Sequence, residues 1–427
     1  MEWLHPQPLF NPLTAPADQL LTGWEILAGP LGLLVFVPAV PLVRWVARRA
    51  PRAAIIGSGA LWILATCGPI ATLALLAWIA LAAWLTHGIA TAALRGACAP
   101  RTGIALLWIV LAALIAPFWW HSSWGWLGWQ PSRMALLHSV GLAYFFLRLI
   151  SWGVDRIARR DEPARARDIA AWLLYAPCMR LGPVIRQRQF RERFDAWRPS
   201  EDVYAKRAAQ RFGLFLLGGA GLALVGRFLP RIAPGAADFF AAPGDYSTAQ
   251  LLSAVALIPT QIYLILWTYN ELAAAISLWI GIPVDNNFDW LPRATSVREF
   301  WRRWHVTVGA WLRDYVYIPL GGARGFAPAM YAAVFGFCAL WHGPSWSFVA
   351  WAATQVVALV VQRGWDRLFE ATRWPRPRGS AWRLLCWLLT LCYQAATIVV
   401  FTDFEHCGLR LFGELLRRAF AVCTAGF

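Results

Sequence analysis

The residue best suited to chemistry in this chain is a histidine at a break between two apolar runs. His342 ends the run ALWH and is followed at once by Gly343 and Pro344, which terminate helices. Such a break lets polar groups face a cavity rather than lipid. A neutral imidazole there can act as a general base near neutral pH, because the usual pKa of histidine is about 6.5. The alternative is a core histidine bonded to a neighbouring carbonyl.

A second histidine lies in similarly aromatic surroundings. His305 closes the run EFWRRWH (residues 299–305), and both histidines could converge on one site. The alternative is a histidine on the wet face of an interfacial helix. Cys338 precedes His342 by one helical turn and shares its helix face, which leaves a Cys–His nucleophile open as a minor alternative. The eight cysteines form no C-x-x-C pair and no zinc-like spacing with histidine, so we expect no metal site.

The elements that must position these side chains are membrane helices. Of the 427 residues, 59% are hydrophobic and only 15% charged, against about a quarter charged in a soluble domain. The net charge of +16 comes from arginines in short loops beside apolar runs, which indicates membrane orientation rather than nucleic-acid binding. Residues 1–22 have no basic start, so we expect no cleavable signal peptide.

Apolar runs of about 20 residues predict the spans of the first half. Two runs separated by Cys67-Gly68-Pro69 predict an out-and-back hairpin, because basic residues flank both outer ends. Three consecutive loops then agree on a cytoplasmic location for the basic clusters, an outward N-terminus and an outer loop at 121–126. The predicted spans are 26–46, 53–66, 70–94, 103–120 and 134–152.

The second half contains more unusual segments. Residues 169–185 are apolar but hold Pro177, Arg180 and Pro183, so we expect a re-entrant or interfacial segment rather than a straight span. Residues 285–325 are too polar to span; from a cap at Ser296, with Glu299 as its capping-box partner, they predict one amphipathic helix at the membrane. Further spans are predicted at 212–229, 249–282, 330–342, 345–361, 384–401 and 409–422, with an outer loop at 230–245 and an Arg-rich loop at 363–383.

These elements total about ten and predict an all-α polytopic membrane protein. We see no internal repeat, so a single multi-pass domain over residues 1–427 is the simplest organisation. Its parts are N-terminal spans (26–152), a re-entrant segment (169–185), further spans (212–282), a motif-bearing core (285–346) and C-terminal spans (347–427).

Two longer motifs contain the histidines: SVREFWRRWHVTVGAWLRDYVYIPLGG (296–322) and LWHGPSW (340–346). Together they resemble the membrane-bound O-acyltransferase family, in its bacterial alginate O-acetyltransferase-like branch. Residues 176–185 resemble the family's segment ending in Gly-Pro-Ile, and 286–288 its Glu-Asn-Phe. The resemblance implies a ring of tilted helices around a central tunnel, with His342 as the catalytic histidine and His305 as the second histidine of the site.

The implied reaction is acyl transfer from a thioester to a hydroxyl. His342 would remove the hydroxyl proton and then protonate the departing thiolate, while His305, Trp304 or a backbone amide would stabilise the oxyanion. Arg302, Arg303 and Arg313 are candidates for the phosphates of coenzyme A, with Asp314 as an internal ion-pair partner. The other candidate substrate- or donor-binding residues are Trp341, Asn287 and Tyr269.

One segment departs from the resembling branch. Residues 261–273 read QIYLILWTYNELA where that branch has a run like QIYFDFSGYSDMA, so Leu264 replaces an acidic residue and Glu271 is a later acidic one. The acceptor side of the cavity is therefore expected to differ from that of the branch. For this reason the resemblance does not imply that alginate is the substrate. The alternative for Arg302, Arg303 and Arg313 is that they serve only membrane topology and packing.

The leading hypothesis is an O-acyltransferase, with acetyl as the expected acyl group, in the inner membrane of a bacterium. Surrounded by membrane lipid, it would use acetyl-CoA or another thioester as co-substrate, with no bound cofactor. The acceptor would be a polysaccharide, a cell-wall glycan or a small secreted compound. A periplasmic acetyltransferase or an acyl-carrier protein is a plausible partner. The alternatives are D-alanyl transfer from a carrier-protein thioester, a secondary transporter and an inactive scaffold.

Overall fold

The computed structural model describes residues 33–425 with gaps at 35, 120–140, 161–163, 180, 233–241, 343–345, 374–376, 378 and 403–408. Within these residues the chain is helical and contains no strand. The expected loop at 121–126 lies outside the described residues, as do much of the 230–245 loop and the starts of the 26–46 and 134–152 spans.

The chain forms two compact units, which are described separately. Among the described residues, unit 1 comprises those of 33–217 and 266–287, and unit 2 comprises those of 218–265 and 288–425. Two long helices, α9 (Ala205–Ile232) and α11 (Thr248–Ile280), continue from one unit into the other.

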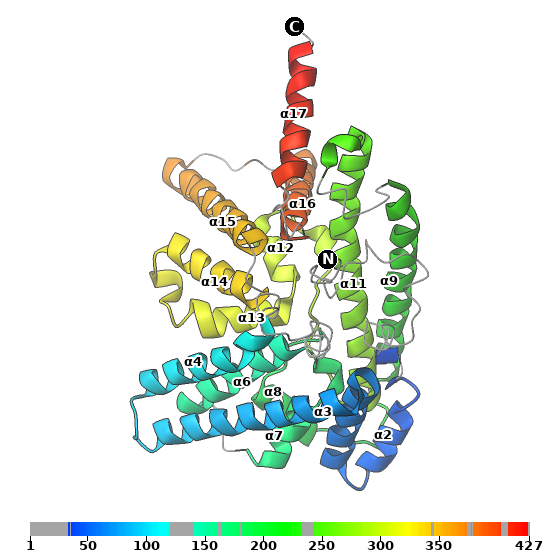
Figure 1. The fold of residues 1–427 in the computed structure, drawn as a ribbon, viewed down its shortest axis with the longest axis vertical. Coiled ribbons are helices and arrows are strands. Elements are labelled where there is room, and N and C mark those ends of the chain that lie inside the picture. Colours follow the sequence, from blue (N-terminus) through cyan, green and yellow to red (C-terminus); the bar gives the residue numbers. More distant parts are fainter. Residues whose placement is uncertain are drawn as a thin grey trace. The chain divides into compact units, whose positions relative to one another are not determined.

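Three helices pack pairwise in unit 1 and are drawn in blue to cyan in Figure 1: α3 (Pro51–Leu94), α4 (Pro100–Trp119) and α6 (Leu142–Ile157). The remaining helices of this unit are α2 (Val40–Ala47), α7 (Ala166–Leu173) and α8 (Gln187–Asp195). The guanidinium of Arg148 on α6 is fully buried and donates to the carbonyl oxygens of Trp172 and Leu173. It therefore caps the end of α7, where the helix dipole favours a positive charge.

Unit 2 carries both histidines and is built from shorter helices followed by long ones. The short ones are α12 (Val297–Arg303), α13 (Val306–Leu312) and a π-helical turn, Arg313–Tyr317. The longer ones are α14 (Ala327–His342), α15 (Trp346–Thr372), α16 (Ser380–Thr402) and α17 (Leu409–Ala425). Helix α15 packs against both α14 and α16.

The hairpin expected at Cys67–Pro69 is wrong, because α3 is one helix of 44 residues that contains Pro69. At 1.5 Å per residue it measures about 66 Å, more than twice the hydrocarbon core of a bilayer. The basic residues that flank it therefore lie at opposite ends of a long helix. This removes one of the three loops on which the orientation argument depends.

The number of elements also differs from the expectation. Four described helices are long and apolar enough to cross a membrane, and three shorter apolar ones accompany them, at Pro51–Ala65, Pro100–Ala116 and Ala327–His342. The four are Thr72–Leu94, Ala205–Arg227, Thr248–Ile280 and Ser380–Phe401. The expected span at 26–46 is not a continuous helix in its described part, since turns precede α2. The Arg-rich loop expected from residue 363 is instead helical as far as Thr372.

The expectation for residues 169–185 is confirmed in its main point. After α7 the chain turns into a 3-10 helix, Ala176–Cys178, and then runs without regular structure to α8. Trp172, Tyr175 and Cys178 are almost fully buried. The segment is thus a broken and buried element, as expected from its prolines.

Candidate active site

His342 is the last residue of α14, and its side chain is exposed although aromatic rings surround it. The imidazole makes edge contacts with Trp341 at 5.0 Å, Trp351 at 6.2 Å and Phe401 at 4.9 Å between ring centroids. Phe348 lies at 5.5 Å. The rings fix the imidazole from several directions, while its exposure leaves it accessible to a substrate.

The local sequence explains this placement. Phe335, Cys338 and Ala339 form the buried face of α14 and pack in one cluster with Phe348 and Trp351 of α15. His342 follows Cys338 by four residues and therefore continues the same face beyond the end of the cluster. The apolar packing of α14 and α15 thus aims the imidazole.

His305 lies in the break between α12 and α13. Its backbone has φ of 45°, in the left-handed region that side chains other than glycine rarely adopt. Its ring is 5.0 Å from that of Phe288 and 5.6 Å from that of Trp304. The single amphipathic helix expected from Ser296 is therefore wrong, because Trp304 is extended and His305 begins a new helix. A strained residue held by its neighbours is typical of a functional position.

The charge state of His305 is set by its surroundings in unit 2. Burial lowers the pKa of His305 to about 3, and a positive charge on His342 lowers that pKa as well. His305 is therefore neutral at physiological pH. A neutral imidazole carries one N–H donor and one acceptor, which suits it to bind a polarised oxygen without changing its charge.

Cys338 is buried in the α14–α15 cluster. A thiol in apolar surroundings stays protonated and unreactive. The structure gives no support to the Cys–His alternative. Among the described residues no group of three or more His, Cys, Asp or Glu side chains could hold a metal ion.

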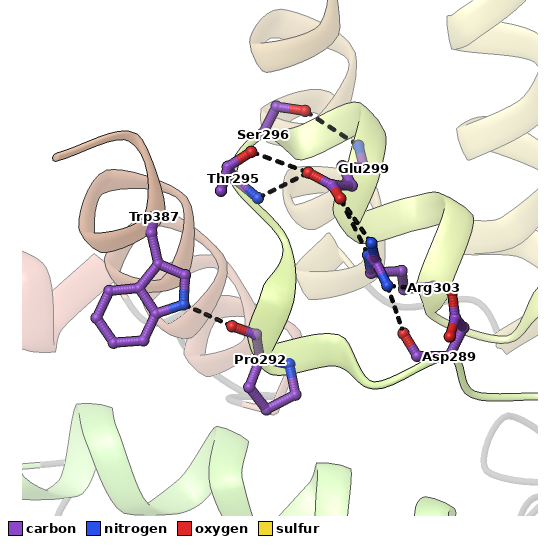
Figure 2. A network of polar contacts seen from close by, with 7 residues as sticks. All are labelled: Asp289, Pro292, Thr295, Ser296, Glu299, Arg303 and Trp387. Atoms are coloured by element: carbon purple, nitrogen blue, oxygen red, sulfur yellow. Dashed lines mark hydrogen bonds and ion pairs between the residues drawn. The ribbon is translucent and has the colours of Figure 1, made fainter. Parts of the chain in front are cut away.

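The helix cap expected at Ser296 is confirmed, and Figure 2 shows the polar network around it. The hydroxyl of Ser296 accepts from the backbone N–H of Glu299 at 3.2 Å. The carboxylate of Glu299 accepts from the backbone and hydroxyl of Thr295, at 3.0 and 2.9 Å, rather than from the backbone of Ser296. Only half of the expected capping box is therefore formed.

Arg303 completes this network. It donates to Glu299 through Nη2 at 2.7 Å and Nε at 3.2 Å, and through Nη1 to Oδ2 and the carbonyl of Asp289, both at 3.0 Å. All three of its nitrogens are engaged inside the protein. These contacts favour the packing interpretation of Arg303 over a role in holding phosphates.

The neighbouring arginines differ. Arg302 is exposed, and no ion-pair partner for it is found in the part of the chain that the structure describes. Arg313 is exposed and bound to Asp314, with Nε to Oδ1 at 2.7 Å, so the expected ion pair is confirmed. The attraction of Asp314, through a hydrogen bond and its charge, raises the pKa of Arg313. Of these three arginines, Arg302 is therefore the one most available for a ligand.

The other candidates divide between the units. Trp304 packs on Phe300 at 5.6 Å and on Tyr263 at 6.1 Å in unit 2. Trp341 is buried beside His342. Tyr269 and Asn287 are buried in unit 1.

The sequence did not reveal Phe348, Trp351 and Phe401 as neighbours of His342, because aromatic residues in a membrane span are common and do not by themselves indicate a site.

Most of the chain matches a known protein family. The family model for the membrane-bound O-acyltransferase family matches residues 102–401, well over half of the chain. The chain belongs to this family. The matched range includes both histidines, the π-helical turn and helices α14 and α15.

The chain is similar to several curated relatives. The probable alginate O-acetylase of Azotobacter vinelandii is 30% identical over 53% of this chain and 45% of the relative, and that of Pseudomonas syringae pv. tomato is 28% identical over 68% and 54%. A peptidoglycan O-acetyltransferase of Helicobacter pylori is 27% identical over 52% and 41%. The chain thus spans about half the length of the curated relatives it matches.

Proposed function

We propose that this protein is an O-acyltransferase that moves an acyl group, acetyl in the first instance, from a thioester to a hydroxyl. The observation that carries the proposal is the exposed imidazole of His342, held by aromatic rings in the same unit as His305. Family membership and the names of the relatives support the same reaction class. They favour it over transport.

His342 acts as the general base in this proposal. It takes the proton of the acceptor hydroxyl as that oxygen bonds to the thioester carbonyl carbon. The carbon–sulfur bond then breaks, and the imidazolium returns the proton to the thiolate. The products are an ester and a free thiol, and no bound cofactor takes part.

His305 stabilises the oxyanion that forms on the carbonyl oxygen. Because its pKa is lowered to about 3, it stays neutral and acts as a hydrogen-bond donor rather than as a competing base. The indole of Trp304 and a backbone amide remain the other candidate donors. Trp341 packs against His342 and shapes the same site.

The donor is proposed to be acetyl-CoA, with Arg302 contacting a phosphate and the Arg313–Asp314 pair bordering the same segment. A carrier-protein thioester is the second candidate, since a teichoic acid D-alanyltransferase of Streptococcus thermophilus is 22% identical over 55% of this chain and 59% of the relative. The acceptor is a hydroxyl on a polysaccharide, a cell-wall glycan or a secreted compound. A periplasmic acetyltransferase could complete the transfer to it.

The proposed setting is the inner membrane of a bacterium. There the helices would form a ring with a central tunnel that joins donor and acceptor sides, in one multi-pass domain with its N-terminus outside. Tyr269 and Asn287, both buried in unit 1, are proposed as substrate- or donor-binding residues.

The test is thioester cleavage by the purified protein in nanodiscs. Acetyl-CoA and an acetylated carrier protein are offered in separate reactions, and free thiol is followed for wild type, His342→Ala and Cys338→Ala. We expect thiol release by wild type and Cys338→Ala and a loss of about a thousandfold or more in His342→Ala. Equal rates in wild type and His342→Ala would contradict the proposal.

A further inference from the structure

A glutamine is completely buried in the middle of α15, one turn after a tryptophan that touches His342. The side chain of Gln355 has no exposed surface. Trp351 precedes it by four residues, so both lie on the same face of α15. A buried amide inside an apolar helix is unfavourable unless its hydrogen bonds are made.

Gln355 makes those bonds to two other helices. Its Oε1 accepts from the indole Nε1 of Trp301 on α12 at 3.0 Å and from Nε2 of Gln394 on α16 at 3.2 Å. Its Nε2 donates to the hydroxyl of Thr397 on α16 at 2.9 Å. Gln394 and Thr397 are also buried. One amide therefore joins α12, α15 and α16.

The aromatic rings connect this amide to the candidate site. The ring of Trp301 lies 5.8 Å from that of Trp351, and Trp351 lies 6.2 Å from His342. Trp301 is also four residues before His305, at the other side of the break between α12 and α13. Gln355 thus lies between the segment that carries His305 and the rings that hold His342.

Two further polar contacts attach α12 along the same face of α15. The backbone N–H of Arg298 donates to Gln362 at 3.1 Å, and its guanidinium binds Asp366 at 3.0 Å. Residues 355, 362 and 366 are spaced by seven and four, as on one helix face. Of these anchors, the one at Gln355 is fully buried and nearest in sequence to Trp351.

We propose that Gln355 is a positioning residue that sets the placement of His305 relative to His342, through its bond to the indole of Trp301. This inference rests on the proposed function of the two histidines. Gln355 does not touch the reacting groups. Its loss would allow α12 to shift, and a displacement of about 1 Å at a reacting group lowers a rate by about a hundredfold.

The test uses Gln355→Met, which keeps the size of the side chain but removes the amide, and Trp301→Phe, which keeps an aromatic ring but removes the indole N–H and part of the ring surface. Thr390→Val is the matched control, since Thr390 is also buried in an apolar helix of unit 2 but its hydroxyl donates within α16, to the carbonyl of Cys386 at 2.7 Å. All variants are purified as full chains in nanodiscs. Their thermal midpoints and their steady-state kinetics with acetyl-CoA are measured.

We expect kcat to fall roughly ten- to a hundredfold in Gln355→Met with KM for acetyl-CoA changed less than about threefold. Trp301→Phe should lower kcat, and the double variant should lose no more than the stronger single variant, because both break the same bond. Gln355→Glu, which keeps an acceptor for the indole, should recover part of the rate. Multiplicative losses in the double variant, or a loss matched by Thr390→Val, would overturn the proposal.

Hydrogen–deuterium exchange separates this inference from the proposed function. Backbone amides of residues 297–312 should exchange faster in Gln355→Met than in wild type or Thr390→Val, whether or not the protein cleaves acetyl-CoA. Unchanged exchange there would contradict the positioning role. Faster exchange without any wild-type thiol release would instead contradict the proposed reaction.

Discussion

Arg302 and Arg303 are adjacent in sequence, but the structure predicts opposite consequences for their replacement by methionine. Arg303 has its three nitrogens bound to Glu299 and Asp289, whereas Arg302 is exposed. Arg303→Met should therefore affect the stability of the fold, and Arg302→Met should affect the donor. The comparison is internally controlled, because both variants lose the same charge.

The expected fall in the free energy of unfolding for Arg303→Met follows from how far Arg303 and its partners are buried. Glu299 is 30% exposed and Arg303 20%, so their charged hydrogen bonds should contribute about 2 kcal/mol. Asp289 is 68% exposed, so that ion pair adds about 0.5 kcal/mol or less. The free energy of unfolding should thus fall by about 2–3 kcal/mol, while KM for acetyl-CoA changes less than about twofold.

Arg302→Met should leave the unfolding free energy within about 0.5 kcal/mol of wild type. It should raise KM for acetyl-CoA about tenfold, the effect of losing one contact of about 1.4 kcal/mol to a phosphate. Thermal unfolding in detergent micelles and thiol-release kinetics give both quantities for each variant. A stable Arg303→Met protein with a tenfold higher KM would refute the assignment of Arg303 to the fold.

Two further predictions concern charge inside the protein. The pKa of His305 in the folded chain, about 3, is below the ordinary 6.5, so its contribution to stability is complete above about pH 6.5 and is lost as the pH falls toward 3. The variant His305→Gln should therefore lose less thermal stability than wild type between pH 7 and pH 5. An identical loss in both proteins would contradict this. Arg211 binds both carboxylate oxygens of Glu271 through Nη1 at 2.9 and 3.0 Å, with the glutamate side chain 3% exposed. Glu271→Leu should destabilise the fold by about 3 kcal/mol, and adding Arg211→Met should recover part of this; a purely additive double variant in thermal unfolding would show that the pair does not act as a unit.

The sequence predicts the long apolar helices well. The expected limits of α11 and α16 agree with the structure within a few residues, because a run of about 20 apolar residues has few alternatives to a helix. The cap at Ser296 is also readable, since its hydroxyl acts on the next turn of the same helix. Local signals of this kind need no knowledge of the rest of the fold.

Errors arise where packing outweighs local signals. Pro69 was expected to end a helix, but α3 continues through it. The regular aromatic spacing of residues 301–312 predicts one helix, yet the contacts of Trp304 and His305 with Phe288 favour a break. Neither outcome follows from the period of the apolar residues alone.

For the candidate site, the sequence identifies the histidines but not the side chains that hold them. Nothing in the run EFWRRWH distinguishes Arg302 from Arg303, because their partners lie elsewhere in the chain. The amide of Gln355 carries a usable signal, since a polar residue within an apolar run must find a partner. Its partners on α12 and α16 become visible only in the folded chain.

The most direct test of the central claim follows the acyl group itself in the reconstituted protein. Acetyl-CoA labelled in the acetyl group is supplied to wild type, His342→Ala and Cys338→Ala in proteoliposomes that enclose a hydroxyl-bearing glycan, and the glycan is analysed by mass spectrometry for the ester. The account predicts labelled ester with wild type and Cys338→Ala and none with folded His342→Ala. Equal labelling in wild type and His342→Ala would contradict it.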